Sequence, residues 1–132
     1  MVDITNLVFT KIKAAVITVV STAKVEKTFQ PTSTVFPAIT IIDLNNPEIS
    51  HTLDYKQRKS KPSWQIDIYM NGGTRETVAK KIAAAIAKVM EDDLRMNRVE
   101  ARPIQNTADT SIYRYMMRYD CTVDEDTGNI YS

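Results

Sequence analysis

The chain has 132 residues, the usual length of one domain, with 43% hydrophobic and 25% charged residues as in globular proteins. Its formal net charge of +1 excludes an overall field that would drive it onto nucleic acid or a membrane surface. The single cysteine, Cys121, excludes an internal disulfide, and no apolar run reaches the roughly 20 residues of a membrane helix. We therefore predict one soluble domain over residues 1–132 that does not enter a membrane.

The first part of the chain predicts one helix and two strands. Apolar residues at spacings of three and four predict an amphipathic helix that begins near Ile4 and ends before Ser21. Lys24–Gln30 alternates weakly and predicts a short strand or an extended segment. Ala38–Leu44 is apolar on both faces, which indicates a strand inside a sheet or one covered by a partner.

A long polar segment follows at residues 45–63. It contains a basic run, which consists of Lys56, Arg58, Lys59 and Lys61. A connection of this length is uncommon in a compact domain and is usually functional or mobile. The alternative is an extended hairpin arm, and the pattern leaves both open.

The middle of the chain is easier to interpret. Trp64–Met70 alternates, with Trp64 and every second residue after it on the apolar side, and predicts a half-buried strand. The Thr74 hydroxyl is positioned to cap the helix that follows, Arg75–Leu94. Arg98–Ile104 predicts one further strand.

The last long strand is predicted over Ser111–Val123. Its apolar set consists of Tyr113, Tyr115, Met117, Tyr119, Cys121 and Val123, and its wetter set begins with Ile112, Arg114, Met116 and Arg118. The tail, Asn129–Ser132, is predicted to fold back as a short hairpin. The element order indicates an α+β fold, in which a mixed, mostly antiparallel sheet packs against two main helices.

Charged residues provide the candidate contact sites. Arg114 and Arg118 either pair with Asp67 or Asp120 across the sheet, or lie at a subunit interface, where arginine is enriched. Met116 shares their face. The basic run is expected to be a solvated loop, or to contact a phosphate backbone or an acidic block in the next subunit. That block consists of Asp124, Glu125 and Asp126.

No catalytic or metal-binding constellation is found in the sequence. His51 is the only histidine and lacks partner ligands, and Asp92 and Asp93 point to different faces of a helix. We expect no enzymatic activity, no cofactor and no metal.

Several segments together resemble the tail-terminator, or tail-completion (head–tail joining), proteins of tailed bacteriophages. They are FPAITI at 36–41, TLDYKQRKSKPSWQIDIYMN at 52–71, AKKIAAAIAKVM at 79–90, and the ending SIYRYMMRYDCTVDEDTGNIYS. The resemblance covers almost the whole chain, but no single piece is a stringent motif.

The resemblance implies a structural virion protein in the tail–neck region, assembled in the host bacterial cytoplasm. It implies a homohexameric ring that caps the tail tube, ends its polymerisation and docks to the connector or neck of the head. The implied partners are other copies of the chain, the tube protein, the connector, and DNA passing through the lumen without sequence-specific recognition. In such a ring the basic run at 56–61 is expected to line the lumen.

Two alternatives to this reading stay open. One is a small nucleic-acid-binding or protein-binding module that uses the basic run at 56–61. The other is the equivalent part of a phage-tail-like bacteriocin.

Overall fold

The framework of the protein is a five-stranded sheet, seen in a computed structural model that describes residues 5–21, 23–26, 36–45, 48–51, 58–104, 112–124 and 130–131. Its strand order is β1 (Lys24–Glu26), β2 (Ala38–Asn45), β5 (Ser63–Met70), β7 (Tyr113–Asp120) and β6 (Asn97–Ile104). Only β1 and β2 run parallel, and the other neighbours are antiparallel. The predicted mixed, mostly antiparallel sheet is confirmed, and β2 lies inside it.

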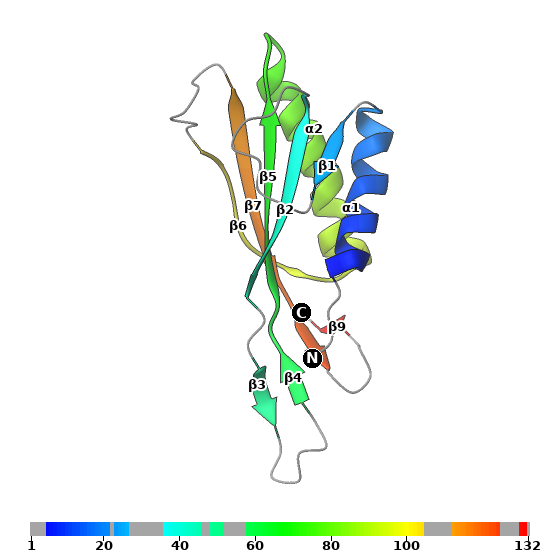
Figure 1. Cartoon of the computed structure of the whole chain (residues 1–132), viewed down its shortest axis with the longest axis vertical. Helices are drawn as coiled ribbons and strands as arrows, with labels where there is room; N and C mark the ends of the chain where they lie inside the picture. The colour runs from blue at the N-terminus through cyan, green and yellow to red at the C-terminus, as the bar shows by residue number, and fades with distance from the viewer. Residues whose placement is uncertain are drawn as a thin grey trace.

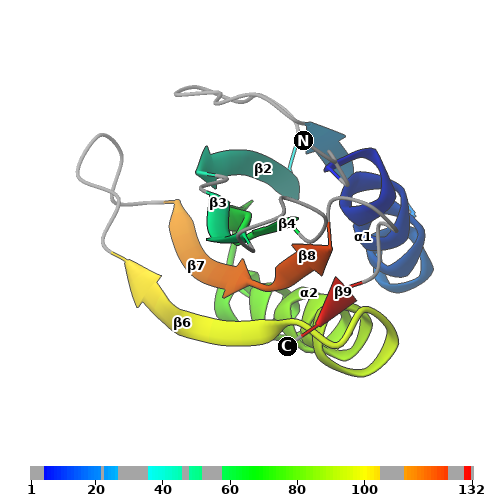
Figure 2. The same cartoon turned by 90° about the horizontal axis from the view of Figure 1, so that it is seen from below.

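Two helices cover one face of this sheet. They are α1 (Thr5–Val19) and α2 (Arg75–Ala87), and Figure 2 shows the strands curving around α2 with α1 beside it. The predicted helix at 75–94 is not one regular α-helix, because its end forms the π-helical turn η1 (Lys88–Asp93). The α+β fold class is therefore confirmed. Within the described part of the chain no helix is long and apolar enough to cross a membrane.

The core lies between the sheet and the helices. The alternation predicted for β5 is confirmed, because Trp64, Ile66, Ile68 and Met70 are all buried. They pack with apolar side chains of α1 and α2, which are Val8, Ile12, Val16, Ala79, Ile82 and Ile86. Burial of these aliphatic and aromatic side chains is the main force that holds the helices on the sheet.

A second, smaller sheet extends from the first. It contains β3 (Glu48–His51), β4 (Arg58–Ser60), β8 (Thr122–Asp124) and β9 (Ile130–Tyr131), in that order. Figure 1 shows β3 and β4 reaching away from the helices along the long axis of the molecule. Strands β3 and β4 pair antiparallel, and residues 52–57 between them lie outside the described part. The choice between a loop and a hairpin arm for residues 45–63 stays a prediction. The predicted C-terminal hairpin is confirmed by the pairing of β8 with β9.

The single strand predicted at 111–123 is wrong in one respect. Strand β7 ends at Asp120, and β8 begins at Thr122 in the other sheet, so the chain changes sheets at Cys121. The Cys121 amide donates a 3.3 Å hydrogen bond to the Pro62 carbonyl at the same level. The alternation of side chains continues through the change, and the Cys121 side chain stays buried. Periodicity alone therefore could not reveal the break.

The turn between β5 and α2 also differs from the prediction. Thr74 occupies the cap position of α2, but its hydroxyl makes no capping hydrogen bond; its carbonyl accepts the Val78 amide at 3.0 Å. Gly72 has φ +90°, a left-handed conformation that glycine adopts without strain. Its carbonyl accepts a 2.9 Å hydrogen bond from Arg75 Nη1. The turn is therefore held by backbone and arginine contacts.

Candidate functional site

The face of the large sheet turned away from the helices, here called the outer face, carries polar side chains from neighbouring strands. Asp67 on β5 lies beside Thr40 on β2 and Met116 on β7, and Gln65 lies beside Arg118. Thr40, Asp67 and Met116 are each at most 2% exposed. The row through Asp67 is therefore buried within one chain, whereas Arg118 in the next row is exposed.

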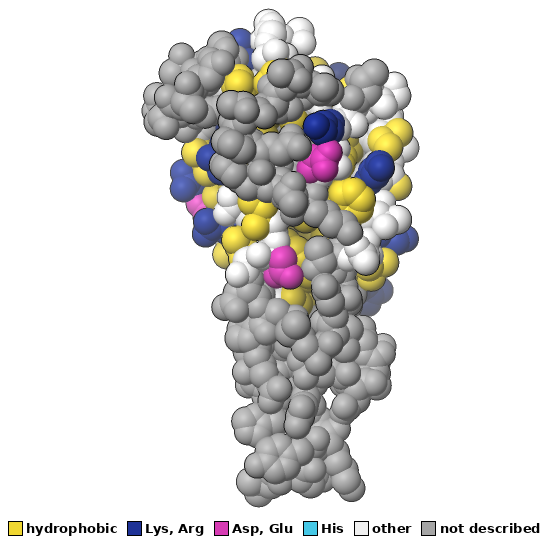
Figure 3. Space-filling view, viewed as in Figure 1, with side chains coloured by type: hydrophobic (Ala, Val, Ile, Leu, Met, Phe, Trp, Pro, Cys, Tyr) yellow, Lys and Arg dark blue, Asp and Glu magenta, His cyan; other side chains and the backbone are white. Residues whose placement is uncertain are grey.

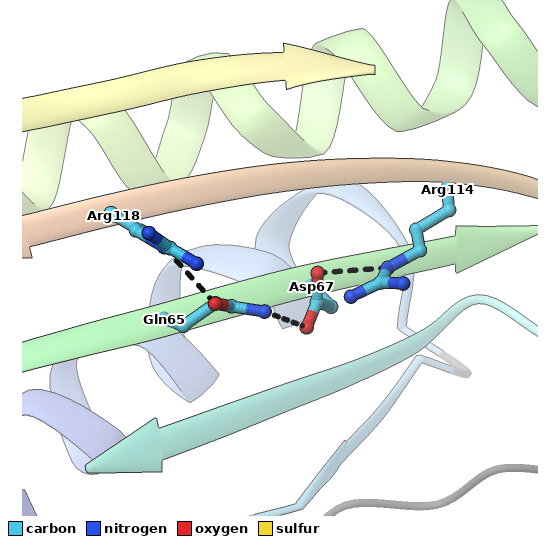
Figure 4. Close-up of polar contacts among 4 residues, drawn as sticks. All are labelled: Gln65, Asp67, Arg114 and Arg118. Atoms are coloured by element: carbon cyan, nitrogen blue, oxygen red, sulfur yellow. Dashed lines mark hydrogen bonds and ion pairs between the residues drawn. The ribbon is translucent and has the colours of Figure 1, made fainter. Parts of the chain in front are cut away.

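Four side chains of the outer face form one hydrogen-bonded network (Figure 4). Arg114 Nε lies 3.0 Å from Asp67 Oδ1, and Gln65 Nε2 donates to Asp67 Oδ2 at 2.9 Å. Arg118 Nε donates in turn to Gln65 Oε1 at 3.1 Å. Among the described residues, these bonds use only Nε of each arginine. The Arg114 guanidinium also lies over the Tyr69 ring, at 5.7 Å from its centroid. Terminal amino groups of arginine are donors that suit a carboxylate or phosphate.

The electrostatics of this network favour fixed charges over proton transfer. Burial disfavours the charged form of Arg114, but the hydrogen bond and charge of Asp67 outweigh burial and raise the pKa of Arg114 overall. Burial, and then the charge of Asp67, raise the pKa of Tyr69, against smaller opposing effects of Arg114 and Thr40. Near neutral pH, Arg114 stays charged and Tyr69 stays protonated. The arrangement suits recognition or structural support.

The two interpretations of Arg114 and Arg118 can now be compared with the structure. The predicted pairing of Arg114 with Asp67 is confirmed, and Arg118 bonds Gln65 instead of a carboxylate. The prediction that Met116 lies on a wetter surface is wrong, because its side chain is 2% exposed. Because the Met116 side chain is buried within its own chain, it offers little surface to another subunit. An interface on this face would therefore use mainly the two arginines.

A second polar cluster ties the end of α2 to the sheet. The Tyr119 hydroxyl donates a 3.2 Å hydrogen bond to Glu91 Oε2 in η1, and Arg98 Nε on β6 lies 3.8 Å from Glu91 Oε1. The Tyr119 side chain is fully buried, so burial first and the Glu91 carboxylate second raise its pKa. The π-helical turn thus has a local role, because it brings Glu91 to β7.

Titration of Cys121 predicts a loss of stability in alkaline solution. Burial, with a smaller effect of Asp120, raises the pKa of Cys121 from 9.0 to about 12. The thiol therefore loses its proton first in the unfolded chain, and its stabilising contribution is present below pH 9 and lost as pH rises toward 12. We expect the unfolding free energy, measured by urea titration with Trp64 fluorescence, to fall by up to about 1.4 kcal/mol per pH unit in this range.

The control for this prediction is Cys121→Ala. This variant is expected to be less stable at pH 7 because it leaves a small cavity, but to lose less stability between pH 9 and 10. Above pH 10 the tyrosines whose pKa values are raised contribute in both proteins. Parallel curves for the two proteins between pH 9 and 10 would show that the thiol is not responsible.

A groove lies between α2 and the strands β6 and β7, on the helix side of the sheet. Its volume is about 230 Å³, and Lys80 and Arg98 stand at its rim. Its floor is small and apolar, formed by Ala83, Ala84, Ala87, Ala101, Tyr115 and Met117. Lys80 pairs with Glu76 at 3.0 Å and Arg98 with Glu91, so both rim cations already have an acidic neighbour. We call this feature the alanine groove.

Comparison with known proteins adds one finding about the fold. No protein-family model matches the sequence, and a search of the curated proteins found no match. Among solved structures, the chain is similar to a chain of the "Virion of native gene transfer agent (GTA) particle", with a TM-score of 0.61 and 13% identity. The likeness covers 89% of this chain and 91% of that chain. At this identity it shows a shared fold.

The structure places only part of the basic run and the acidic block. Arg58 and Lys59 lie in β4 and Asp124 lies in β8, where the backbone register sets Lys59 opposite Asp124 in the same chain. Lys61 is exposed, and its Nζ lies 3.6 Å from Asp120 Oδ2. The other predicted residues, Lys56, Glu125 and Asp126, lie outside the described part.

The acidic block assigned to a neighbouring subunit therefore begins next to the basic run of its own chain. Figure 3 agrees with a mixed surface, since basic side chains are dispersed over the described area in that view and do not form one patch. In the described residues no group of three His, Cys, Asp or Glu side chains could hold a metal ion.

Three features of the site were not predicted from the sequence. They are the buried position of Asp67, its bond to Gln65, and the Tyr119–Glu91 contact. The only signal for the first was a carboxylate within an otherwise apolar strand. The Asp67–Gln65 bond joins neighbours on one face of β5, and the pattern does not show which of the available partners each side chain takes. The Tyr119–Glu91 contact joins residues 28 positions apart and depends on the irregular turn η1.

Proposed function

We propose that this chain is a structural, non-enzymatic protein of a tailed-phage-like particle, and that it acts as a tail terminator. In this proposal a homohexameric ring caps the tail tube, ends polymerisation of the tube protein and presents a docking surface to the connector of the head. One observation carries it, namely the near full-length likeness in fold to a chain of a gene transfer agent virion. The resemblance of its sequence segments to tail terminators points the same way.

The shape of the molecule supports an assembly role. A helix-backed sheet forms a body, and the arm of β3 and β4 projects from it along the long axis (Figure 1). A body of this kind can pack side by side in a ring while the arm reaches a neighbouring component. We propose that residues 1–132 act as one such unit, with residues 45–63 as its arm.

The proposed contacts use the charged residues of the sheet and arm. The terminal amino groups of Arg114 and Arg118, which take no part in the bonds to Asp67 and Gln65, are suited to carboxylates of a neighbouring protein. Met116 contributes little because it is buried. Lys56, Arg58, Lys59 and Lys61 are proposed to face the lumen or the acidic block of a neighbour. Contact with DNA there would be sequence-independent and sensitive to salt.

Length control of the tail tube tests the proposal. The tube protein encoded with this chain is polymerised with and without it, and tube lengths and ends are measured by electron microscopy. We expect tubes of uncontrolled length without the chain, and with it a ring at one end and arrested growth. Unaltered lengths, together with tight, salt-sensitive DNA binding by a monomer or dimer, would favour a nucleic-acid-binding module instead.

The tail–neck position in the virion is tested on assembled particles. Antibody or gold labelling of a tag on this chain is expected to mark the junction of head and tail. Label on the distal tail or the head shell would contradict the terminator role. A headless particle with label at the tube end would indicate a tail-like bacteriocin with the same capping role.

A further inference from the structure

We propose that the exposed face of α1 in one subunit seats in the alanine groove of the next subunit. This inference rests on the proposed ring, and it names the surfaces that the ring would use. It concerns a second copy of this chain and no other partner.

The first observation is an apolar stripe on the outer side of α1. Leu7 and Ile17 are each 40% exposed, and Thr10 and Ala14 lie exposed between them at spacings of three and four. Four residues at these spacings share one face of a helix. The opposite side of α1, which carries Val8, Ile12 and Val16, is fully buried in the core. The core of the monomer therefore packs against the opposite side of α1 and does not use the outer stripe.

The second observation is the lining of the alanine groove, which consists mostly of small side chains. Alanines supply most of its floor from α2, and side chains this small let a second helix approach closely. Ala84 is exposed at this site, while Met117 beneath it is buried. Aliphatic side chains of the stripe would find apolar surface there, and their burial would provide the driving force.

The third observation is the position of the two surfaces on the molecule. Strand β1, which follows α1, and strand β6, which borders the groove, are the two opposite edges of the sheet. Figures 1 and 2 both show α1 and β6 on opposite flanks with α2 between them. Two different surfaces on opposite flanks make a head-to-tail contact, and such contacts close into rings when the rotation between subunits allows.

Charge gives the contact its orientation. Lys11 is exposed beside the stripe, and Asp92 and Asp93 are exposed in η1, directly after the Glu91 that contacts Arg98 at the groove rim. Within the described residues none of these three forms an ion pair. A lysine on the incoming helix and carboxylates in η1, the turn that follows α2, have complementary charges, and such charges steer and orient association more than they strengthen it.

The edge strand β6 favours side-chain packing over strand addition. Its register shifts between Arg98 and Glu100, which marks an irregularity around the exposed Val99, and Pro103 lacks an amide hydrogen. Bulges, prolines and charges on an edge are the features that discourage pairing with a further strand. A neighbour on this flank would therefore contact α2 and the groove instead of extending the sheet.

Cysteine cross-linking of assembled rings tests the contact. Ile17→Cys is combined with Ala84→Cys, and the native Cys121 does not interfere because it is 1% exposed. Mild oxidation of the ring on its tube is expected to link chains into a ladder that ends at the closed ring. The matched control combines Ala84→Cys with Leu44→Cys, an exposed position on β2 instead of α1, and is expected to stay unlinked.

Two single variants separate this inference from the proposed function. Ala84→Arg and Ile17→Lys change exposed positions, so each is expected to keep the native Trp64 fluorescence while the concentration for half-assembly rises about tenfold or more. If both variants assemble into rings at the same concentration as the wild type, the seating of α1 in the groove is overturned, and the ring function stands. A cross-linked dimer from Ile17→Cys alone would indicate α1 against α1 and also overturn it. A wild-type chain that forms no ring on its tube would remove both proposals.

Discussion

Replacing Arg114 with methionine is expected to lower the unfolding free energy by about 3–5 kcal/mol, because it leaves the buried Asp67 carboxylate without its cation. Asp67 is 1% exposed and Arg114 24% exposed, so the carboxylate depends on the pair more than the guanidinium does. The reverse change, Asp67→Asn, is therefore expected to cost less, about 2 kcal/mol, since Arg114 keeps some contact with water. Urea unfolding followed by Trp64 fluorescence at pH 7 measures both.

Two controls make this prediction specific. Glu100→Gln removes a carboxylate that pairs with Arg102 at the exposed edge, and a much smaller loss than that of Arg114→Met is expected because water screens this pair. The double variant Asp67→Leu with Arg114→Met replaces both charges by apolar groups and should recover much of the stability lost by Arg114→Met alone. A double variant as unstable as the single one would show that the cost comes from packing and not from an unpaired charge.

Shortening Ile66 to alanine is expected to cost about 4 kcal/mol, because it opens a cavity at the centre of the core. Ile66 is fully buried on β5, the middle strand of the large sheet, which lies between β2 and β7. Its side chain belongs to the core between the sheet and the helices. Partial collapse around the cavity would reduce the cost without removing it. Chemical denaturation at constant pH gives the value.

The matched control is Ile42→Ala on the neighbouring strand β2. Ile42 is the same residue type but is only partly buried, so a smaller loss of about 1–2 kcal/mol is expected. Equal losses at Ile42 and Ile66 would mean that the core does not lie where the helices cover the sheet. An unchanged dependence on urea concentration in both variants would show that the folded state keeps its compactness.

Local patterns predicted most elements because each reflects a property of short range. The spacing of apolar residues identified α1 and α2, and the alternation in Trp64–Met70 identified both the strand and its buried side. The same reasoning fails where geometry changes without a change of pattern. The sheet change at Cys121 keeps the alternation intact, and the π-helical turn keeps helical composition.

The candidate contacts were predicted less completely, for the same physical reason. The sequence marked Arg114 and Arg118 and raised the pairing with Asp67, because charges that alternate on a strand need partners across a sheet. It could not show that Met116 is buried beside them or that Gln65 bridges Asp67 and Arg118. The alanine groove likewise needs α2, β6 and β7 in place before it exists.

By itself the sequence determined the α+β class, the two helices, the inward faces of the strands and the charged residues available for assembly. These follow from periodicity and residue chemistry, which act over a few residues. Only the tertiary structure decided which strands pair, where the chain crosses between sheets, and that Lys59 lies opposite Asp124. Such pairings join segments tens of residues apart, and burial and hydrogen bonding select them for the chain as a whole.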